Sequence, residues 1–132
     1  MKLTTLLDSH VIEMMEWFPS EVELKQWAGP GFRYPFDLST FTEDLKISST
    51  NSFSLVSEEG ELLGFGQYYQ RLDKCHLGRL VVNPKFRGKG IITTLIKHIS
   101  EQGTKVLNVT GCSLFVLSHN KSAVKAYQKA GF

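Results

Sequence analysis

The sequence predicts a mixed α/β (α+β) domain with one β-sheet and helices packed on it. Three features predict this class: apolar residues at helical spacing in several segments, alternating strand patterns in the middle of the chain, and a glycine-rich loop between a strand and a long amphipathic helix. At 132 residues the chain is long enough for one hydrophobic core but not for two. We therefore expect a single domain over residues 1–132.

The first half of the chain is predicted to begin with a strand and to continue as three helices. Asp8 or Ser9 can cap the first helix and Ser20 the second, because short polar side chains accept hydrogen bonds from the free amides of a helix start. Pro19 separates these two helices. The strand is expected over residues 2–7 and the third helix over residues 40–47.

The second half is predicted to contain a hairpin, two further strands and two helices. The turn Glu58-Glu59-Gly60 joins the hairpin strands. Apolar residues from Ile91 to Ile99 fall at helical spacing and mark a long amphipathic helix. The strands are expected over residues 53–56, 62–69, 77–82 and 114–117, and the last helix over residues 120–130.

Composition and charge exclude several classes of protein. The formal net charge is only +2, from 15 Lys+Arg and 13 Asp+Glu, whereas nucleic-acid binders carry a strong and clustered basic excess. No stretch approaches the roughly 20 apolar residues of a membrane span, and residues 1–15 lack the apolar run of a signal peptide. We expect a soluble, cytoplasmic protein that binds neither nucleic acid nor a membrane.

The two cysteines, Cys75 and Cys112, lie in apolar, strand-like runs without CxxC spacing. This placement is typical of reduced thiols in the core of a cytoplasmic protein, with a disulfide as the alternative. We expect no bound metal.

The most informative segment is the basic loop Lys85-Phe86-Arg87-Gly88-Lys89-Gly90, which follows a strand and precedes the long helix. A helix start presents unpaired N–H groups and the positive end of a dipole, and glycines let the backbone approach an anion closely. The loop therefore predicts a phosphate or pyrophosphate site, with a glycine-rich surface turn as the alternative. It is not a P-loop, because Gly90 is followed by Ile91 rather than lysine. Nor is it a dinucleotide fingerprint, because Thr93 stands where a third glycine is required.

The loop resembles that of the GNAT superfamily of acyl-CoA N-acyltransferases. Arg87, Gly88-Lys89 and Gly90 fit the Arg/Gln-x-x-Gly-x-Gly/Ala pattern with which this family grips the pyrophosphate of coenzyme A. Ile92 departs from the pattern, because the family has glycine or alanine at this position. The larger side chain is expected to crowd the first turn of the helix.

Two further segments carry the same resemblance. The segment Leu80-Val81-Val82-Asn83-Pro84 is similar to the family's fourth strand. The end of the chain, with Leu114-Phe115-Val116, Asn120-Lys121-Ser122-Ala123, Tyr127 and Gly131-Phe132, is similar to the family's next strand, splayed asparagine and final helix. These motifs occur in the family's order, which makes the resemblance more specific than any one of them.

The resemblance implies a single mixed, mostly antiparallel sheet flanked by helices, which opens into a V between residues 77–82 and 114–117. Pantetheine would lie in that gap and pair with backbone groups of Leu80 and Val82, as an added strand pairs with a sheet edge. The family's last strand has no counterpart before Phe132, so we expect a partner subunit, as in a homodimer, or a longer natural chain to cover that edge. The residues implied to bind acetyl-CoA are Leu80, Val81, Val82, Arg87, Gly88, Lys89, Gly90, Ile91, Ile92 and Asn120.

The activity that the resemblance implies is transfer of an acetyl group from acetyl-CoA to a primary amine of a small molecule or peptide, by direct attack in a ternary complex. The N–H group of Val82 would polarise the thioester carbonyl. Tyr127 is the candidate general acid at the departing sulfur, with packing of its ring in the core as the alternative. A module that holds acyl-CoA as a sensor, without turnover, is the alternative function.

The general base and the acceptor side stay open in the sequence. His76, on the strand that leads to the loop, is the base that we name, and the other candidates are His119 and Tyr68 or Tyr69. The aromatic, glycine-rich stretch over residues 27–34 predicts a wall on the acceptor side, or else a hydrophobic plug under a surface loop.

Overall fold

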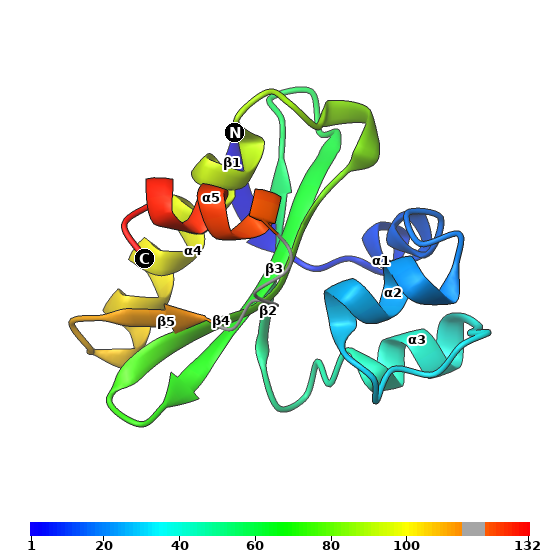
Figure 1. Ribbon diagram of the computed structural model, residues 1–132, viewed down its shortest axis with the longest axis horizontal. Helices are drawn as coiled ribbons and strands as arrows, with labels where there is room; N and C mark the ends of the chain where they lie inside the picture. The colour runs from blue at the N-terminus through cyan, green and yellow to red at the C-terminus, as the bar shows by residue number, and fades with distance from the viewer. Residues whose placement is uncertain (115–120) are drawn as a thin grey trace.

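The computed structural model of the chain describes residues 1–114 and 121–132 (Figure 1). The candidates Asn120 and His119, and positions 115–117 of an expected strand, lie outside the described residues. In chain order the elements are β1 (Lys2–Thr5), α1 (Asp8–Met15), α2 (Glu21–Ala28), α3 (Leu38–Asp44), β2 (Asn51–Val56), β3 (Leu62–Arg71), β4 (Lys74–Val82), the 3₁₀ helix η1 (Pro84–Phe86), α4 (Ile91–Leu107), β5 (Cys112–Leu114) and α5 (Lys121–Lys129).

Among the described residues, five strands form one sheet in the order β1-β2-β3-β4-β5. The strands β1 to β4 pair antiparallel with their neighbours, and β5 runs parallel to β4. Figure 1 shows α1, α2 and α3 on one side of the sheet and α4 and α5 on the other. The predicted mixed, mostly antiparallel sheet flanked by helices is confirmed. In this part of the chain no helix is long and apolar enough to cross a bilayer.

Each side of the sheet has its own apolar core. The α1–α3 core consists of the buried residues Val11, Met14, Trp17, Phe18, Leu24, Phe32, Phe41, Leu45, Leu62, Phe65 and Val81. The α4 core consists of the buried residues Leu55, Leu63, Tyr68, Cys75, Leu77, Ile91, Leu95, Ile96 and Ile99. The helical spacing that predicted α4 thus corresponds to the face that this helix turns toward the sheet.

Strand β4 contains a β-bulge that changes which side its residues face. The single residue Gly66 of β3 lies opposite two residues of β4, Arg79 and Leu80, and Arg79 has φ = 48°, in the left-handed region. Leu77 and Leu80 both pack on the α4 side, while the Arg79 side chain contacts Phe32 of the α1–α3 core. In an uninterrupted strand Arg79 would face the same side as Leu77. The bulge therefore directs a cation toward the opposite side of the sheet.

The start of α1 differs from the prediction. The helix begins at Asp8, so Leu7 rather than Asp8 or Ser9 occupies the N-cap position. The backbone N–H of Leu7 donates to Nδ1 of His10 at 3.2 Å. This contact is the reciprocal half of a capping box, in which the third helical residue accepts from the N-cap amide, and Leu7 has no polar side chain to accept from the helix amides.

The other two helix starts follow the capping rule more closely. Ser20 caps α2 as predicted, because its Oγ accepts a hydrogen bond from the N–H of Glu23 at 3.2 Å. The third helix starts two residues earlier than predicted. Its N-cap is Asp37, whose carboxylate accepts from the N–H of Thr40 at 2.8 Å.

Candidate functional site

The glycine-rich loop joins the end of β4 to the start of α4. Gly88 and Gly90 have φ values of 81° and 73°, in the left-handed region that glycine adopts without steric cost. A Cβ built on either residue would meet no atom within 4 Å, so both face open space. Gly90 is the N-cap of the 17-residue α4, and no side chain in the described part of the chain caps this helix. Its first amides are therefore left for a ligand.

Positive charge surrounds this helix start. Lys85, Arg87 and Lys89 are exposed, and Nζ of Lys89 lies 5.7 Å from the centroid of the Phe86 ring. The positive end of the α4 dipole adds to these charges. Exposed amides, glycines and cations at one helix start are the features that bind a phosphate or pyrophosphate group.

The two isoleucines at the start of α4 point toward the core. Ile91 is only 7% exposed, and Ile92 is partly buried against the α4 core. The first helical turn forms with Ile92 in place. Their expected contribution to a cofactor site is therefore that of the backbone N–H groups.

Asn83 anchors the loop to the sheet. Its side chain is 3% exposed, and its Nδ2 donates to the backbone oxygen of Leu62 at 2.9 Å and to the carboxylate of Glu13 at 3.2 Å. Its Oδ1 accepts from the N–H of Lys85 at 3.0 Å. The sequence identified Asn83 only as a strand stop. An asparagine before a proline also signals a side chain that bonds to the backbone two residues on.

Asn83→Ala is expected to destabilise the protein by about 1–3 kcal/mol, because buried partners such as the Leu62 carbonyl lose their hydrogen bond. It is also expected to weaken cofactor binding, since the loop loses its anchor. Asn51→Ala is the matched control: Asn51 is exposed, and its amide donates over 3.4 Å to the Tyr68 carbonyl. The control is expected to change stability by less than about 0.5 kcal/mol. Equal melting temperatures for the two variants would contradict the role of Asn83 as the anchor of the loop.

The sheet is open beside the last residues of β4. Strand β5 pairs with β4 only over Cys75–Leu77. Over Gly78–Val82, none of the residues that the structure describes pairs with β4 on the β5 side. The backbone of Leu80 and Val82, implied for pairing with pantetheine, lies in this segment. The side chain of Val81 faces away from it, into the α1–α3 core.

Tyr127 lies on α5 and is partly buried against the α4 core. Burial raises the pKa of its phenol above the ordinary value. A raised pKa keeps the hydroxyl protonated, which is the form that a general acid or hydrogen-bond donor requires. Both interpretations of Tyr127 are compatible with this position, so its catalytic role stays a prediction.

His76 lies in the paired part of β4. It is 3% exposed, and its Nδ1 is 2.9 Å from Oγ of Ser113 on β5. Burial, and to a lesser degree the charge of Arg71, lower the pKa of the imidazole, which favours the neutral form that a base requires. His76 precedes Leu80 by four residues, about 10 Å along the strand because the bulge takes up one of them. A catalytic role would thus require a proton relay, and it stays a prediction.

The two cysteines are neighbours across β4 and β5. Cys75 and Cys112 are register partners, both are free thiols, and Cys75 is fully buried while Cys112 is partly exposed. Burial, followed by the neighbouring Cys112, raises the pKa of Cys75 to about 12. Cys75 is therefore a poor nucleophile at neutral pH.

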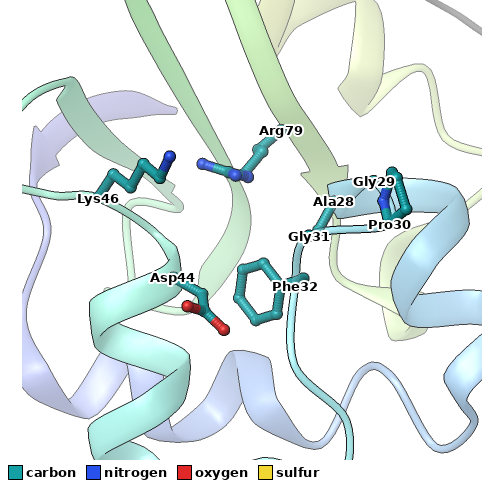
Figure 2. Close-up of a pocket in the computed structure, with 8 residues that line it drawn as sticks. All are labelled: Ala28, Gly29, Pro30, Gly31, Phe32, Asp44, Lys46 and Arg79. Atoms are coloured by element: carbon teal, nitrogen blue, oxygen red, sulfur yellow. The ribbon is translucent and has the colours of Figure 1, made fainter.

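A pocket of about 160 Å³ lies on the α1–α3 side of the sheet (Figure 2). It is lined by Ala28 at the end of α2, by residues 29–32 of the following loop, and by Asp44, Lys46 and Arg79. Part of the stretch predicted as an acceptor-side wall thus forms this pocket. Trp27 instead packs against the α1–α3 core, and the centroids of its ring and of the Phe18 ring are 4.4 Å apart. The sequence did not indicate the three charged residues, because they come from α3, the segment after it, and β4.

The carboxylate of Asp44 is engaged by Arg33. Oδ2 of Asp44 accepts from the backbone N–H of Arg33 at 3.0 Å and from its Nε at 3.1 Å, and Oδ1 accepts from Nη2 at 2.9 Å. These hydrogen bonds lower the pKa of the Asp44 carboxyl. The pocket thus contains one carboxylate that is already paired and two cations, Lys46 and Arg79.

Strand β4 thus leads into a basic glycine loop at a helix start and presents Arg79 to a separate pocket. The chain belongs to the acetyltransferase (GNAT) family, whose model matches residues 14–132. The resemblance that the loop and the end of the chain predicted is therefore confirmed.

Two curated relatives are a spore coat polysaccharide biosynthesis protein and a spermidine N(1)-acetyltransferase. The chain is 32% identical over 78 residues to a spore coat polysaccharide biosynthesis protein of Bacillus subtilis, a match that covers 59% of this chain and 27% of that protein. It is 33% identical over 54 residues to the spermidine N(1)-acetyltransferase of Escherichia coli, covering 41% of this chain and 29% of the enzyme. The chain thus spans less than a third of the curated relatives it matches.

Solved structures share the fold at low identity. A spermidine N-acetyltransferase of Vibrio cholerae, in complex with coenzyme A and spermine, superimposes with a TM-score of 0.75 at 17% identity, covering 98% of this chain and 79% of that one. An aminoglycoside acetyltransferase with coenzyme A and kanamycin gives a TM-score of 0.77 at 22% identity, covering 99% and 83%.

Proposed function

We propose that this chain transfers an acetyl group from acetyl-CoA to a primary amine of a small molecule or peptide, by direct attack in a ternary complex. The observation that carries the proposal is the arrangement of β4. This strand leads into the basic glycine loop, has no partner on the β5 side over Gly78–Val82 among the described residues, and presents Arg79 to a pocket on its other side. Two substrates bound to one strand would lie close enough to react without an intermediate carrier.

The chemistry assigns a task to each group. An alkyl amine with a pKa of about 10.4 is mostly protonated at neutral pH and must lose a proton before it attacks. The N–H of Val82 would donate to the carbonyl oxygen as negative charge develops on it. Tyr127 would donate its hydroxyl hydrogen to the departing sulfur. The proton from the amine would leave through water or a base such as His76.

Cys75 does not support the alternative route through a covalent acyl-enzyme. A covalent route requires a nucleophile, and Cys75, with a pKa of about 12 and no exposed surface, is unsuited to that task. Initial velocities that vary both substrates distinguish the routes. Intersecting lines are expected in double-reciprocal plots, and parallel lines would indicate a covalent intermediate.

Two measurements together test the proposal. Calorimetry with acetyl-CoA reports binding, and release of free thiol in the presence of a panel of amines reports turnover. Binding with amine-dependent thiol release is expected. Binding without release, across the whole panel, would favour the alternative of a sensor module. Absence of acetyl-CoA binding would overturn both.

A further inference from the structure

The guanidinium of Arg79 is incompletely satisfied by the protein. Both hydrogen bonds that it makes within residues 1–114 and 121–132 come from Nη1, to the backbone oxygen of Leu45 at 3.4 Å and to Oε1 of Gln67 at 3.2 Å. Both acceptors are neutral. Its Nε is buried without a hydrogen-bond partner in this part of the chain. A partly buried cation that lacks an anionic partner is costly, so this site is suited to receive an anion.

Among the described residues that line the pocket, Asp44 is the one carboxylate; its charge attracts the Arg79 guanidinium without forming an ion pair with it. The Asp44 carboxylate is bound by Arg33, and no carboxylate in the described part of the chain lies within ion-pair distance of Arg79 or Lys46. Figure 2 shows the amino end of Lys46 and the guanidinium of Arg79 pointing toward one another across the pocket, and the Asp44 carboxylate pointing away from them. Two like charges that face each other repel, and an anion between them removes that repulsion.

The shape of the pocket limits the size of that anion. At about 160 Å³ the pocket is smaller than the roughly 300–1,000 Å³ that encloses a drug-sized ligand, so it takes one end of a molecule. Because Arg79 immediately precedes Leu80, an acceptor held there would lie beside the segment assigned to pantetheine. A planar carboxylate matches the geometry of a guanidinium.

We propose that the amine acceptor also carries a carboxylate, as a free amino acid does, and that Arg79 and Lys46 bind this carboxylate in the pocket. This inference rests on the proposed acetyl transfer, since it names the class of acceptor for the same site. It also separates this chain from the structural neighbours that were solved with spermine and kanamycin. Those two ligands are polyamines without a carboxylate, and the two cations of this pocket would repel them.

The test compares each acceptor with a partner that lacks only the negative charge. L-amino acids are assayed beside their own carboxamides, with spermidine and kanamycin as amines without a carboxylate, by thiol release from acetyl-CoA. The same compounds are titrated calorimetrically into the protein saturated with coenzyme A, so that binding is measured without turnover. The carboxylate form is expected to have a kcat/KM and an affinity about 10- to 100-fold higher than the carboxamide, as charged hydrogen bonds allow.

Variants assign this preference to the two cations. Lys46→Gln and Arg79→Gln are each expected to raise KM for the amino acid about 10-fold or more, to change the KM for the carboxamide much less, and to leave the acetyl-CoA affinity near the parental value. Lys46 is exposed, so its variant keeps the fold even if Arg79→Gln loses stability. Lys105→Gln, at an exposed position near the end of α4, is the charge-matched control and is expected to behave as the parent.

The outcomes separate this inference from the proposed function. If acetyl-CoA binds and carboxamides or spermidine are acetylated at least as well as the amino acids, the acetyltransferase stands and the carboxylate inference is wrong. The carboxylate inference is also wrong if no amino acid binds or reacts. A carboxylate preference in the calorimetric titration that is lost in Lys46→Gln supports the inference even without turnover.

Discussion

Replacing Gly90 by valine is expected to raise the Kd of acetyl-CoA about 100-fold or more. The residue has φ = 73°, and a Cβ placed on it would have no atom within 4 Å, so the valine side chain would occupy the space in front of the α4 amides. A β-branched residue also avoids the left-handed region, which would distort the helix start that binds the pyrophosphate. Arg87→Ala, which removes one exposed charge, is expected to have a milder effect.

Gly60→Val separates the loss of a ligand site from backbone strain. Gly60 has φ = 85°, also has open space around the position of a Cβ, and lies in the turn between β2 and β3. Both variants are expected to lower the melting temperature, because both place a branched side chain at positive φ. Only the Gly90 variant is expected to lose acetyl-CoA binding in calorimetry. A folded Gly90→Val protein that binds acetyl-CoA with the parental affinity would contradict the assignment of the loop to the cofactor site.

Tyr127→Phe is expected to lower kcat by about 10²–10⁴ while the affinity for acetyl-CoA stays nearly unchanged. The substitution keeps the ring that packs against the α4 core and removes only the hydroxyl. A hydrogen bond to the departing sulfur would form mainly in the transition state, so its loss affects turnover rather than binding. Steady-state kinetics with a reactive amine, together with calorimetry, measures both quantities.

The pH dependence adds a second test of Tyr127. Burial raises the pKa of its phenol, so the hydroxyl stays protonated and able to donate throughout the neutral range. Activity that depends on this hydroxyl is expected to fall only above the ordinary phenol pKa of about 10. This alkaline limb should be absent from the Phe variant. A folded variant with parental kcat would leave Tyr127 with a packing role alone.

The elements that the sequence predicted well are those with a local periodic signal. The long helix α4 follows from the spacing between Ile91 and Ile99, and the hairpin follows from the alternation over residues 53–56 and the turn at Gly60. The basic glycine loop was identified for the same reason: its glycines and cations are contiguous, and the helix start that they flank is next to them in the chain.

The features that the sequence could not predict depend on contacts between distant segments. The bulge in β4 adds one residue to a strand, and an alternating pattern contains no sign of it apart from Gly78, since glycine in a strand often marks a bulge. Lys46 and Arg79 line the same pocket although they are 33 residues apart in the chain. Local sequence patterns do not show that two such distant residues lie close together. The predicted cap of α1 was wrong because the helix begins at Asp8, so that Leu7 occupies the N-cap position and its N–H donates to His10.

Because of the single extra residue in β4, the side chains and the backbone of this strand face different parts of the molecule. The Arg79 side chain faces one side of the sheet, and the backbone over Gly78–Val82 has no partner on the β5 side within residues 1–114 and 121–132. Under the proposed roles, the choice of amine depends on the side chains of Lys46 and Arg79, whereas pairing with the pantetheine depends on the main chain of Leu80 and Val82, which substitutions at Lys46 and Arg79 leave in place. A library of variants confined to Lys46 and Arg79 should therefore yield enzymes with new acceptors that share one acyl donor.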